Sequence, residues 1–245
     1  MKHIDLNCDL GEGAGHDAEL MPLISSANIA CGAHAGSLET MIETVELANK
    51  YEVGIGAHPG FFDLENFGRT ERAISPPEAG RLVLMQIEQL FEVAGDKLRH
   101  VKLHGALYNQ VSRDAFLADS IVSEIARLWP NLTLFALAGS QLARSARSRG
   151  LHLAEEVFAD RTYQSDGSLT PRTHANGLIQ DPAAAVAQVL AMVDRGVVRS
   201  TEGPEIAVVA DTVCVHGDSP QALAFVRRLR EELAAAGIAV KPYNA

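Results

Sequence analysis

Gly32-Ala33-His34-Ala35-Gly36 and Gly56-Ala57-His58-Pro59-Gly60 are two near-copies of one phrase, and each closes an apolar run typical of a β-strand. His104 and His216 also follow short apolar runs, so four of the nine histidines stand where a strand is expected to end. In barrels of alternating strands and helices, that edge carries the chemistry. The sequence therefore predicts an enzyme with a histidine-rich mouth.

Strand-like and helix-like segments alternate along the whole chain. The expected strands are residues 3–9, 26–31, 53–58, 100–104, 133–138, 152–158, 206–216 and 238–241. The expected helices are residues 37–51, 76–94, 114–129, 140–149, 182–195 and 219–236. Repeated β–α units imply a parallel sheet, and seven or eight such strands favour closure into a ring. We predict an α/β fold, an irregular TIM-like barrel forming one domain over residues 1–245.

An open, doubly wound sheet is the alternative fold. No G-x-G-x-x-G motif follows the first strand, and polar strand ends are spread along the chain, which favours the closed ring. Helix starts are marked by a capping box at 75–78 and by the pairs Asp181-Pro182 and Ser219-Pro220. Segments 60–75 and 159–180 are too long for ordinary turns and are predicted to be lids or binding loops.

Composition excludes several classes of protein. The chain carries 31 acidic and 21 basic side chains, a net charge of -10, and no Lys/Arg-rich run, so a nucleic-acid partner is not expected. The longest apolar stretch is too short to span a membrane, and no secretory signal is expected. The three cysteines are far apart in the sequence and are expected to be buried and reduced. We expect a cytoplasmic protein.

Alternation along the strands places polar or small side chains on one face. In the first strand Asp5, Asn7 and Asp9 share a face, and the outer face of a barrel must be apolar, so these groups point inward. An inward charge must be paired, solvated or bound to a ligand. A purely structural network among strand-end charges is one possibility, and a functional cleft is the favoured one. The charges concerned are Asp5, Asp9, Lys102 and Glu156.

Three further features carry weaker signals. The Gly-rich loop at 11–15 offers backbone amides to a phosphate or substrate, although it matches no phosphate-binding fingerprint. Cys214 beside His216 is expected to pack rather than act as a nucleophile. Acids of the first strand with His58 and His104 are suitable metal ligands, but no tight spacing supports a metal, so its presence stays open.

Six segments together resemble the LamB/YcsF family, whose members are described as the A subunit of the prokaryotic 5-oxoprolinase. The resemblance covers nearly the whole chain, in order. The matching segments are residues 5–12, 27–36, 56–60, 102–109, 156–163 and 215–218.

The resemblance implies a β/α barrel related to the glycoside hydrolase/deacetylase superfamily. It also implies ATP-dependent opening of 5-oxoproline to L-glutamate, with Mg²⁺ accompanying the ATP and subunits B and C as partners. A five-membered lactam is a poor electrophile, which explains the need for ATP. The expected route is phosphorylation of the lactam oxygen followed by attack of water.

Such a route needs donors for the oxygen and phosphate and a base for the water. We predict catalytic roles for Asp9, Glu12, His34, His58, Lys102, His104, Glu156 and His216. We predict binding of substrate or phosphate by Asp5, Asn7, Asn28, Asp160, Arg161 and Arg172. Which carboxylate is the base, and whether ATP binds this chain or a partner, stays open.

Two other functions compete with this one. A stand-alone, metal-dependent hydrolase or deacetylase would use the same acids and histidines without ATP. A non-catalytic subunit would only present 5-oxoproline, or a related ligand, to its partners.

Overall fold

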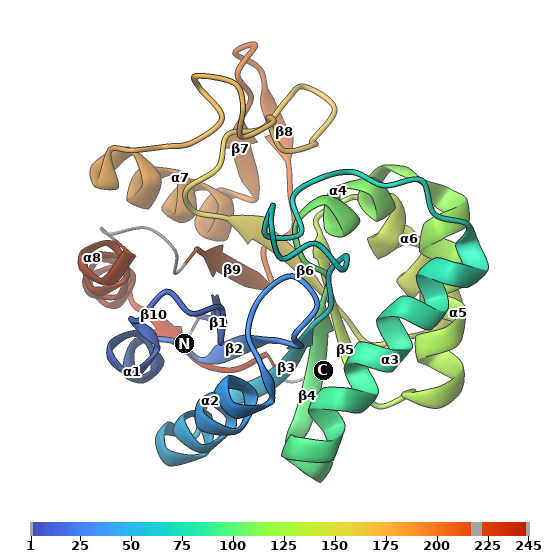
Figure 1. The fold of residues 1–245 in the computed structure, drawn as a ribbon. Coiled ribbons are helices and arrows are strands. Elements are labelled where there is room, and N and C mark those ends of the chain that lie inside the picture. The colour runs from blue at the N-terminus through green and yellow to red at the C-terminus, as the bar shows by residue number, and fades with distance from the viewer. Residues whose placement is uncertain (1, 217–221, 244–245) are drawn as a thin grey trace.

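A ring of parallel strands forms the centre of the computed structural model, which describes residues 2–216 and 222–243 (Figure 1). The strands of the ring are β1 (Lys2–Leu10), β2 (Ser26–Ala30), β3 (Gly54–His58), β4 (Leu98–Lys102), β5 (Thr133–Leu137), β6 (Leu153–Phe158) and β9 (Thr212–Val215). Pairing of β1 with β9 closes the ring. The predicted α/β, TIM-like barrel is confirmed, with seven parallel strands in the described ring.

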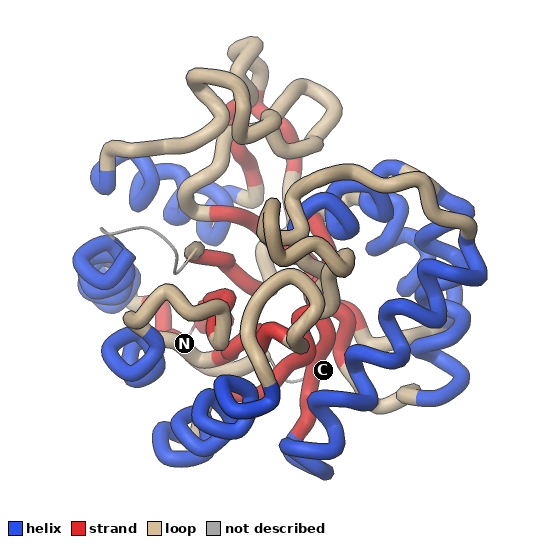
Figure 2. Tube along the Cα trace, viewed as in Figure 1, coloured by secondary structure: helices blue, strands red, loops and turns tan. Residues whose placement is uncertain are grey.

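Helices surround the ring on its outside (Figures 1 and 2). They are α1 (Asp17–Leu20), α2 (Leu38–Tyr51), α3 (Pro76–Ala94), α4 (Gly105–Arg113), α5 (Ala115–Leu128), α6 (Gln141–Arg149), α7 (Pro182–Arg195) and α8 (Ala222–Ala235), with 3-10 turns at Met21–Leu23 and Gly95–Lys97. Outward strand residues such as Leu6, Val101 and Val213 are fully buried beneath them. Each such side chain contributes about 1.5–3 kcal/mol on burial. This layer holds the ring and its inner face in place.

The expected strand at 206–216 is wrong in its extent. It divides into β8 (Glu205–Ala207), which pairs with β7 (Val197–Arg199) outside the ring, and β9. Asp211 lies in the break, where its amide donates to the Glu155 carbonyl and its carboxylate accepts from the Glu155 amide. These two hydrogen bonds direct the chain from β8, outside the ring, back into the ring at β9. The last expected strand is β10 (Ile238–Val240), which pairs with the start of β1 and is not part of the ring.

Helix α4 was not predicted from the sequence. It is short, and none of the usual capping residues precedes it, because His104 occupies the N-cap position and Gly105 has φ 54°. The capping box of Ser75 and Glu78 is confirmed, and Asp181 caps α7 through the Ala183 amide at 3.0 Å. The start signal Ser219-Pro220 lies outside the described residues, as do positions 219–221 of the expected last helix.

Small residues on the inner face make room for large polar ones, as the alternation predicts. A Cβ added at Gly56 would lie only 2.0 Å from Nε2 of His100, so no larger residue fits opposite that ring. His100 stacks on Phe135 and its Nε2 lies 2.9 Å from Oδ1 of Asn28. His100 is thus a satisfied histidine of the barrel interior rather than of its mouth.

The two long segments gather with other loops at the carboxyl end of the strands (Figure 2). Segment 60–75 contacts the start of α4, where the Ala106 amide donates a hydrogen bond to the Gly68 carbonyl at 3.0 Å. Segment 159–180 forms bridges within itself and one to Ser200 near β7. Among the described helices, none combines the length and the apolar character that crossing a bilayer requires.

Candidate active site

Lys102 lies between two carboxylates inside the barrel. Its Nζ is 2.7 Å from Oδ1 of Asp9 and 3.2 Å from Oε1 of Glu156, and all three side chains are buried. Burial opposes the ammonium charge, but Asp9, with Cys214 and Glu156, raises the pKa of Lys102 well above its ordinary value. Burial likewise opposes the Asp9 charge, yet His58 and Lys102 bring the pKa of Asp9 well below its ordinary value. Lys102 is therefore a fixed cation, and Asp9 a fixed anion, at neutral pH.

Amide and hydroxyl groups hold these charges in position. Asn28 Nδ2 donates to Oδ1 of Asn7 at 2.7 Å and to Oδ1 of Asp9 at 2.8 Å. Asn7 Nδ2 donates to Oε1 of Glu156 at 3.0 Å. The two asparagines orient the charges, and their predicted direct contact with substrate stays a prediction.

Tyr108 was missed as a site residue by sequence reasoning. Its hydroxyl donates to Oε2 of Glu156 at 2.7 Å from the first turns of α4. Burial, and then Glu156, raise the pKa of Tyr108 well above its ordinary value, so the hydroxyl remains a proton donor. The signal was present, because Tyr108 follows His104 by four residues within a segment of family resemblance, but it requires α4 to be recognised as a helix.

Asp5 lies four residues before Asp9 on β1 and is therefore deeper in the barrel than Asp9. Its Oδ1 accepts from the hydroxyls of Ser25 and Ser26, each at 2.7 Å, and its Oδ2 accepts from Thr212 at 2.5 Å. Burial raises the pKa of Asp5, although the hydroxyl donors partly oppose this. Asp5 is thus satisfied by the protein itself toward the amino end of β1. This placement suits a structural role, and the predicted contact of Asp5 with substrate stays a prediction.

Three of the four strand-end histidines meet around Glu12. Oε1 of Glu12 lies 3.1 Å from Nε2 of His34, 3.3 Å from Nδ1 of His104 and 3.8 Å from Nε2 of His58. His34 and His104 stack with centroids 3.7 Å apart. Burial lowers the pKa of His34 to about 3 and that of His104 well below its ordinary value, so both rings are neutral.

The segment after β3 packs closely on this cluster. A Cβ at Gly60 would lie 2.8 Å from Nδ1 of His34, and one at Gly68 would lie 2.7 Å from Cβ of His34. Phe67 contributes its carbonyl to Nε2 of His104 at 2.9 Å. Glycine is required at positions 60 and 68 because the backbone of this segment packs directly against the histidine rings and leaves no space for a Cβ atom.

His216 lies apart from the other three histidines. Its Nδ1 is 2.9 Å from Oδ2 of Asp160, and both groups are partly exposed. Burial raises and His216 lowers the pKa of Asp160, with a net decrease. His216 also approaches Asp9 and Cys214, and their ligand atoms all lie within 4.8 Å of one another. Burial raises the pKa of Cys214 well above its ordinary value, so the thiol is not an activated nucleophile.

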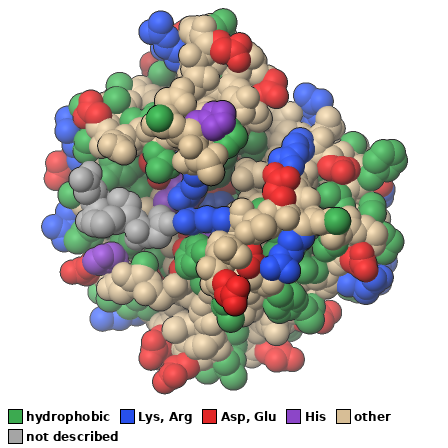
Figure 3. Space-filling model, turned by 45° about the horizontal axis from the view of Figure 1, so that its top comes forward, with side chains coloured by type: hydrophobic (Ala, Val, Ile, Leu, Met, Phe, Trp, Pro, Cys, Tyr) green, Lys and Arg blue, Asp and Glu red, His purple; other side chains and the backbone are tan. Residues whose placement is uncertain are grey.

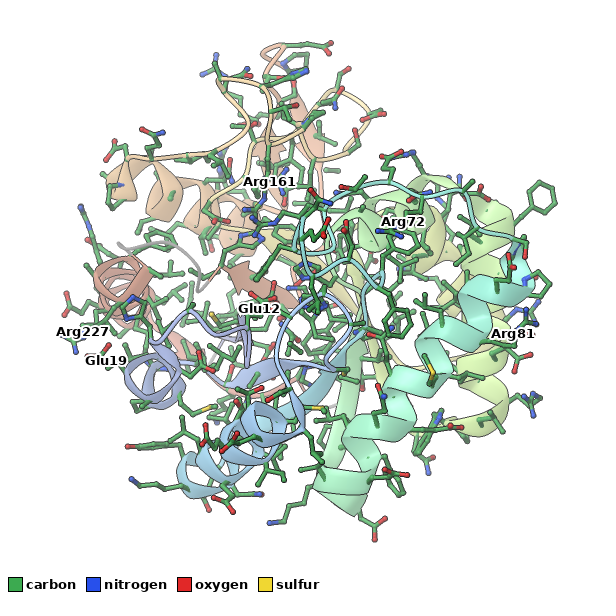
Figure 4. All side chains as sticks on the ribbon, in the orientation of Figure 1. Glu12, Glu19, Arg72, Arg81, Arg161 and Arg227 are labelled. Carbon is green, nitrogen blue, oxygen red and sulfur yellow. The ribbon has the colours of Figure 1, made fainter. Side chains whose placement is uncertain are left out.

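The two predicted arginines lie in segment 159–180. Arg161 is buried, and its guanidinium donates to the carbonyls of Thr170 and Gly177 within its own segment. Arg172 is close enough to contribute to the electrostatics of both Arg161 and Asp160. Figure 4 shows Arg161 above the barrel and Glu12 near its centre. Figure 3 shows Lys or Arg side chains and a His where this face is hollowed.

The Gly-rich loop has one of its backbone amides already engaged, and its contact with a phosphate or substrate stays a prediction. The Gly11 amide donates to Oδ2 of Asp17 at 2.7 Å, and Glu12 brings a carboxylate toward the histidines. The Gly11 amide, which already donates to Asp17, and the nearby Glu12 carboxylate both make this loop less suited to binding phosphate. The group Glu12, His34, His58 and His104 instead offers donor atoms that all lie within 4.8 Å of one another, a spacing suited to a metal ion.

We expect the free energy of unfolding to decrease as the pH falls below about 6.5, and His100→Gln to remove part of that decrease. Burial, and then Lys102, lower the pKa of His100 to about 3, whereas the same side chain in the unfolded chain titrates near its ordinary value. Between those values the unfolded state binds more protons, so acid destabilises the fold. The contribution is about 1.4 kcal/mol per pH unit, or about 2 kcal/mol at about pH 5.

Urea unfolding of both proteins at about pH 7.5 and about pH 5 measures this difference. Glutamine keeps a donor for Asn28 but has no titrating group. The same pH dependence in both proteins would show that His100 is not held neutral.

A family model described as "LamB/YcsF family" matches residues 4–245. The chain belongs to the LamB/YcsF family. The predicted resemblance is thereby confirmed, and it extends over nearly the full chain, as predicted.

Relatives of this LamB/YcsF protein match it from end to end. A protein of Shouchella clausii (strain KSM-K16), named as the A subunit of 5-oxoprolinase, is 50% identical, with 100% of each chain covered. The protein of the same name from Bacillus subtilis (strain 168) is 49% identical, covering 98% of this chain and 96% of that one. The crystal structure of the lactam utilization protein from Thermus thermophilus superposes with a TM-score of 0.89 at 44% identity, covering 98% and 99% of the two chains.

Proposed function

We propose that this LamB/YcsF protein is the A subunit of an ATP-dependent 5-oxoprolinase and carries the ring-opening chemistry. The observation that supports this most directly is the buried ion trio of Lys102, Asp9 and Glu156, set at the carboxyl end of a barrel. Burying such charges costs several kcal/mol, and perturbed acids and bases gathered in a cleft indicate function. Relatives about half identical over the full chain are named as the A subunit of 5-oxoprolinase, which supports 5-oxoproline as the substrate.

The reaction requires activation of a weak electrophile. In the proposed route ATP, with Mg²⁺, transfers its γ-phosphoryl group to the lactam oxygen, releasing ADP. Water then adds to the ring carbon and gives a proton to a base. The carbon–nitrogen bond breaks, its electron pair and a proton go to nitrogen, and the open product is a γ-glutamyl phosphate. A second water hydrolyses this acyl phosphate to L-glutamate and inorganic phosphate.

The geometry supports our proposal of particular side chains for parts of this route. Lys102 stabilises negative charge on the lactam oxygen, because a fixed cation in a water-poor site strengthens such contacts. Glu156 is our choice for the base, since it accepts hydrogen bonds from Tyr108 and Asn7 and so has a fixed orientation. Tyr108 is placed to pass a proton to or from Glu156.

The rim supplies the groups that bind rather than react. We place the substrate carboxylate or the phosphate near Arg161 and Arg172, beside Asp160 and His216. The arginine guanidinium suits planar oxyanions because it offers parallel N–H donors. Cys8, Cys31 and Cys214 are free and buried, which agrees with the cytoplasmic location that an ATP-consuming enzyme implies.

The test is reconstitution with the partner subunits B and C. Glutamate release from 5-oxoproline is measured for this chain alone, for the partners alone and for the mixture, each with and without Mg-ATP. We expect release only from the complete mixture with ATP. Release by this chain alone, with a divalent cation and no ATP, would instead identify a stand-alone metal-dependent hydrolase.

A third outcome concerns a presenting subunit. If Lys102→Met leaves turnover of the complete mixture unchanged, Lys102 takes no part in the chemistry. That result would favour a chain that only brings the lactam to its partners.

A further inference from the structure

Two of the clustered histidines have their tautomers fixed by backbone carbonyls. Nδ1 of His58 lies 2.8 Å from the Lys102 carbonyl, and Nε2 of His104 lies 2.9 Å from the Phe67 carbonyl. A carbonyl only accepts, so each of these nitrogens carries the hydrogen. The opposite nitrogen of each ring, Nε2 of His58 and Nδ1 of His104, then keeps its lone pair unless a second proton or a metal ion takes it.

Those two lone pairs face each other at 2.9 Å inside the protein. Two acceptors at that distance repel unless something positive lies between or beside them. Oε1 of Glu12 lies 3.3 Å from Nδ1 of His104, and Oδ2 of Asp9 lies 3.3 Å from Nε2 of His58, so negative groups surround the same point. The arrangement requires a shared proton or a metal cation.

His34 extends the set to three imidazoles. Its Nε2 lies 3.1 Å from Oε1 of Glu12, and the donor atoms of all four side chains lie within 4.8 Å of one another. Ligands about 2.0–2.2 Å from a common ion are about 3–4 Å apart. The separations given for four of the six donor pairs, 2.9, 3.1, 3.3 and 3.8 Å, are close to that range. The side chains of the four residues are no more than 6% exposed, so few waters compete for the ion.

We propose that Glu12, His34, His58 and His104 form a binding site for a divalent transition-metal ion of the zinc class. Three imidazole nitrogens and one carboxylate are the donors that Zn²⁺ and its neighbours prefer, whereas Mg²⁺ takes oxygen ligands. The site is therefore separate from the Mg²⁺ that accompanies ATP. It does not depend on the proposed reaction, because the geometry alone supports it.

The hydrogen bond made by the second ring nitrogen of each histidine indicates how firmly that histidine would hold the ion. In proteins, a metal-bound imidazole commonly donates its second nitrogen to a carbonyl or carboxylate. His58 and His104 each have such a carbonyl. Nδ1 of His34 has no hydrogen-bond partner within the described part of the chain, so we expect His34 to hold the ion least firmly.

The experiment uses the full chain purified without chelator, treated with a chelator and then titrated with Zn²⁺ or Co²⁺. Metal content is measured by elemental analysis, and Co²⁺ is followed by its visible absorption. We expect about one equivalent of Zn²⁺ per chain and a Co²⁺ spectrum typical of nitrogen and oxygen ligands, unchanged by excess Mg²⁺. Thermal unfolding with and without Zn²⁺ gives a second readout, since a bound ion raises the melting temperature.

Variants identify the ligands. His58→Gln and His104→Gln are expected to weaken binding by more than about 100-fold, because losing only an outer partner of a ligand costs about 10- to 100-fold. His34→Gln should weaken it less. His152→Gln is the matched control, because His152 is exposed, and it should bind like the unchanged protein.

Metal binding by the unchanged protein tests the proposed site even where a variant does not fold. Absence of Zn²⁺ and Co²⁺ binding by the chelated, folded chain would overturn the site and leave a proton shared by His58 and His104. Equal binding by His58→Gln, His104→Gln and His152→Gln would overturn it as well. Failure of ATP-dependent glutamate release, by contrast, would count against the proposed function and leave the metal site intact.

Discussion

Lys102→Met is expected to lower ATP-dependent glutamate release by the reconstituted complex by at least about a hundredfold. The ammonium group lies 2.7 Å from Asp9 and 3.2 Å from Glu156, in a buried position where no mobile cation replaces it. Methionine fills nearly the same volume but cannot stabilise an oxyanion. The loss should appear mainly in kcat, because the contact is strongest once charge develops on the lactam oxygen.

The matched control is Lys97→Met. Lys97 is exposed, and its Nζ bonds only Asn49 among the partners described for it. We expect the complex reconstituted with Lys97→Met to release glutamate at the unchanged rate. Circular dichroism at the assay temperature establishes that Lys102→Met remains folded. Near-normal turnover of folded Lys102→Met would remove Lys102 from the chemistry.

Asp9→Asn is expected to lower the free energy of unfolding by about 3 kcal/mol. The two oxygens of Asp9 serve different neighbours, since Oδ1 contacts Lys102 at 2.7 Å and Oδ2 contacts His58 at 3.3 Å. Asparagine keeps the shape but removes the charge, which leaves the buried Lys102 ammonium with Glu156 alone. Breaking a buried pair on one side is costly because the remaining charge stays desolvated.

Urea unfolding at neutral pH measures the change, and Asp119→Asn is the comparison. Asp119 pairs with Arg149 on the surface, where solvent screens the charges, so we expect little change there. If the two variants lost the same stability, Asp9 would not anchor the interior charges. The same samples, tested for turnover, also report whether Asp9 serves the reaction.

The sequence predicted the barrel and its lining well, because strand alternation is a local property. Asn7 and Asp9 point inward as expected, and Lys102 from a distant strand meets Asp9. Register across a parallel ring brings such residues to similar heights, so convergence follows from topology. The same reasoning placed Asp5 beside Asp9, although Asp5 stands four residues earlier on β1 and so lies deeper in the barrel.

What could not be predicted depends on loops. Alternation does not reveal that Glu12, in the turn after β1, reaches His34 and His104, since turn geometry is set by glycine dihedrals and by contacts far along the chain. The same dependence on turn geometry explains why the sequence did not predict that His34, His58 and His104 cluster while His216 lies apart. Tyr108 was missed because α4 lacks a recognisable start.

The balance of charge in the mouth has a consequence for how a ligand would lie there. Inside the barrel one ammonium, that of Lys102, accompanies the carboxyl groups of Asp9, Glu12 and Glu156. When no metal ion is bound at Glu12, carboxyl groups outnumber the ammonium group here, and the interior disfavours the carboxylate of a ligand. A lactam acid would therefore enter ring first, with its amide toward Lys102, and leave its own carboxylate outside, among the guanidinium groups of the rim.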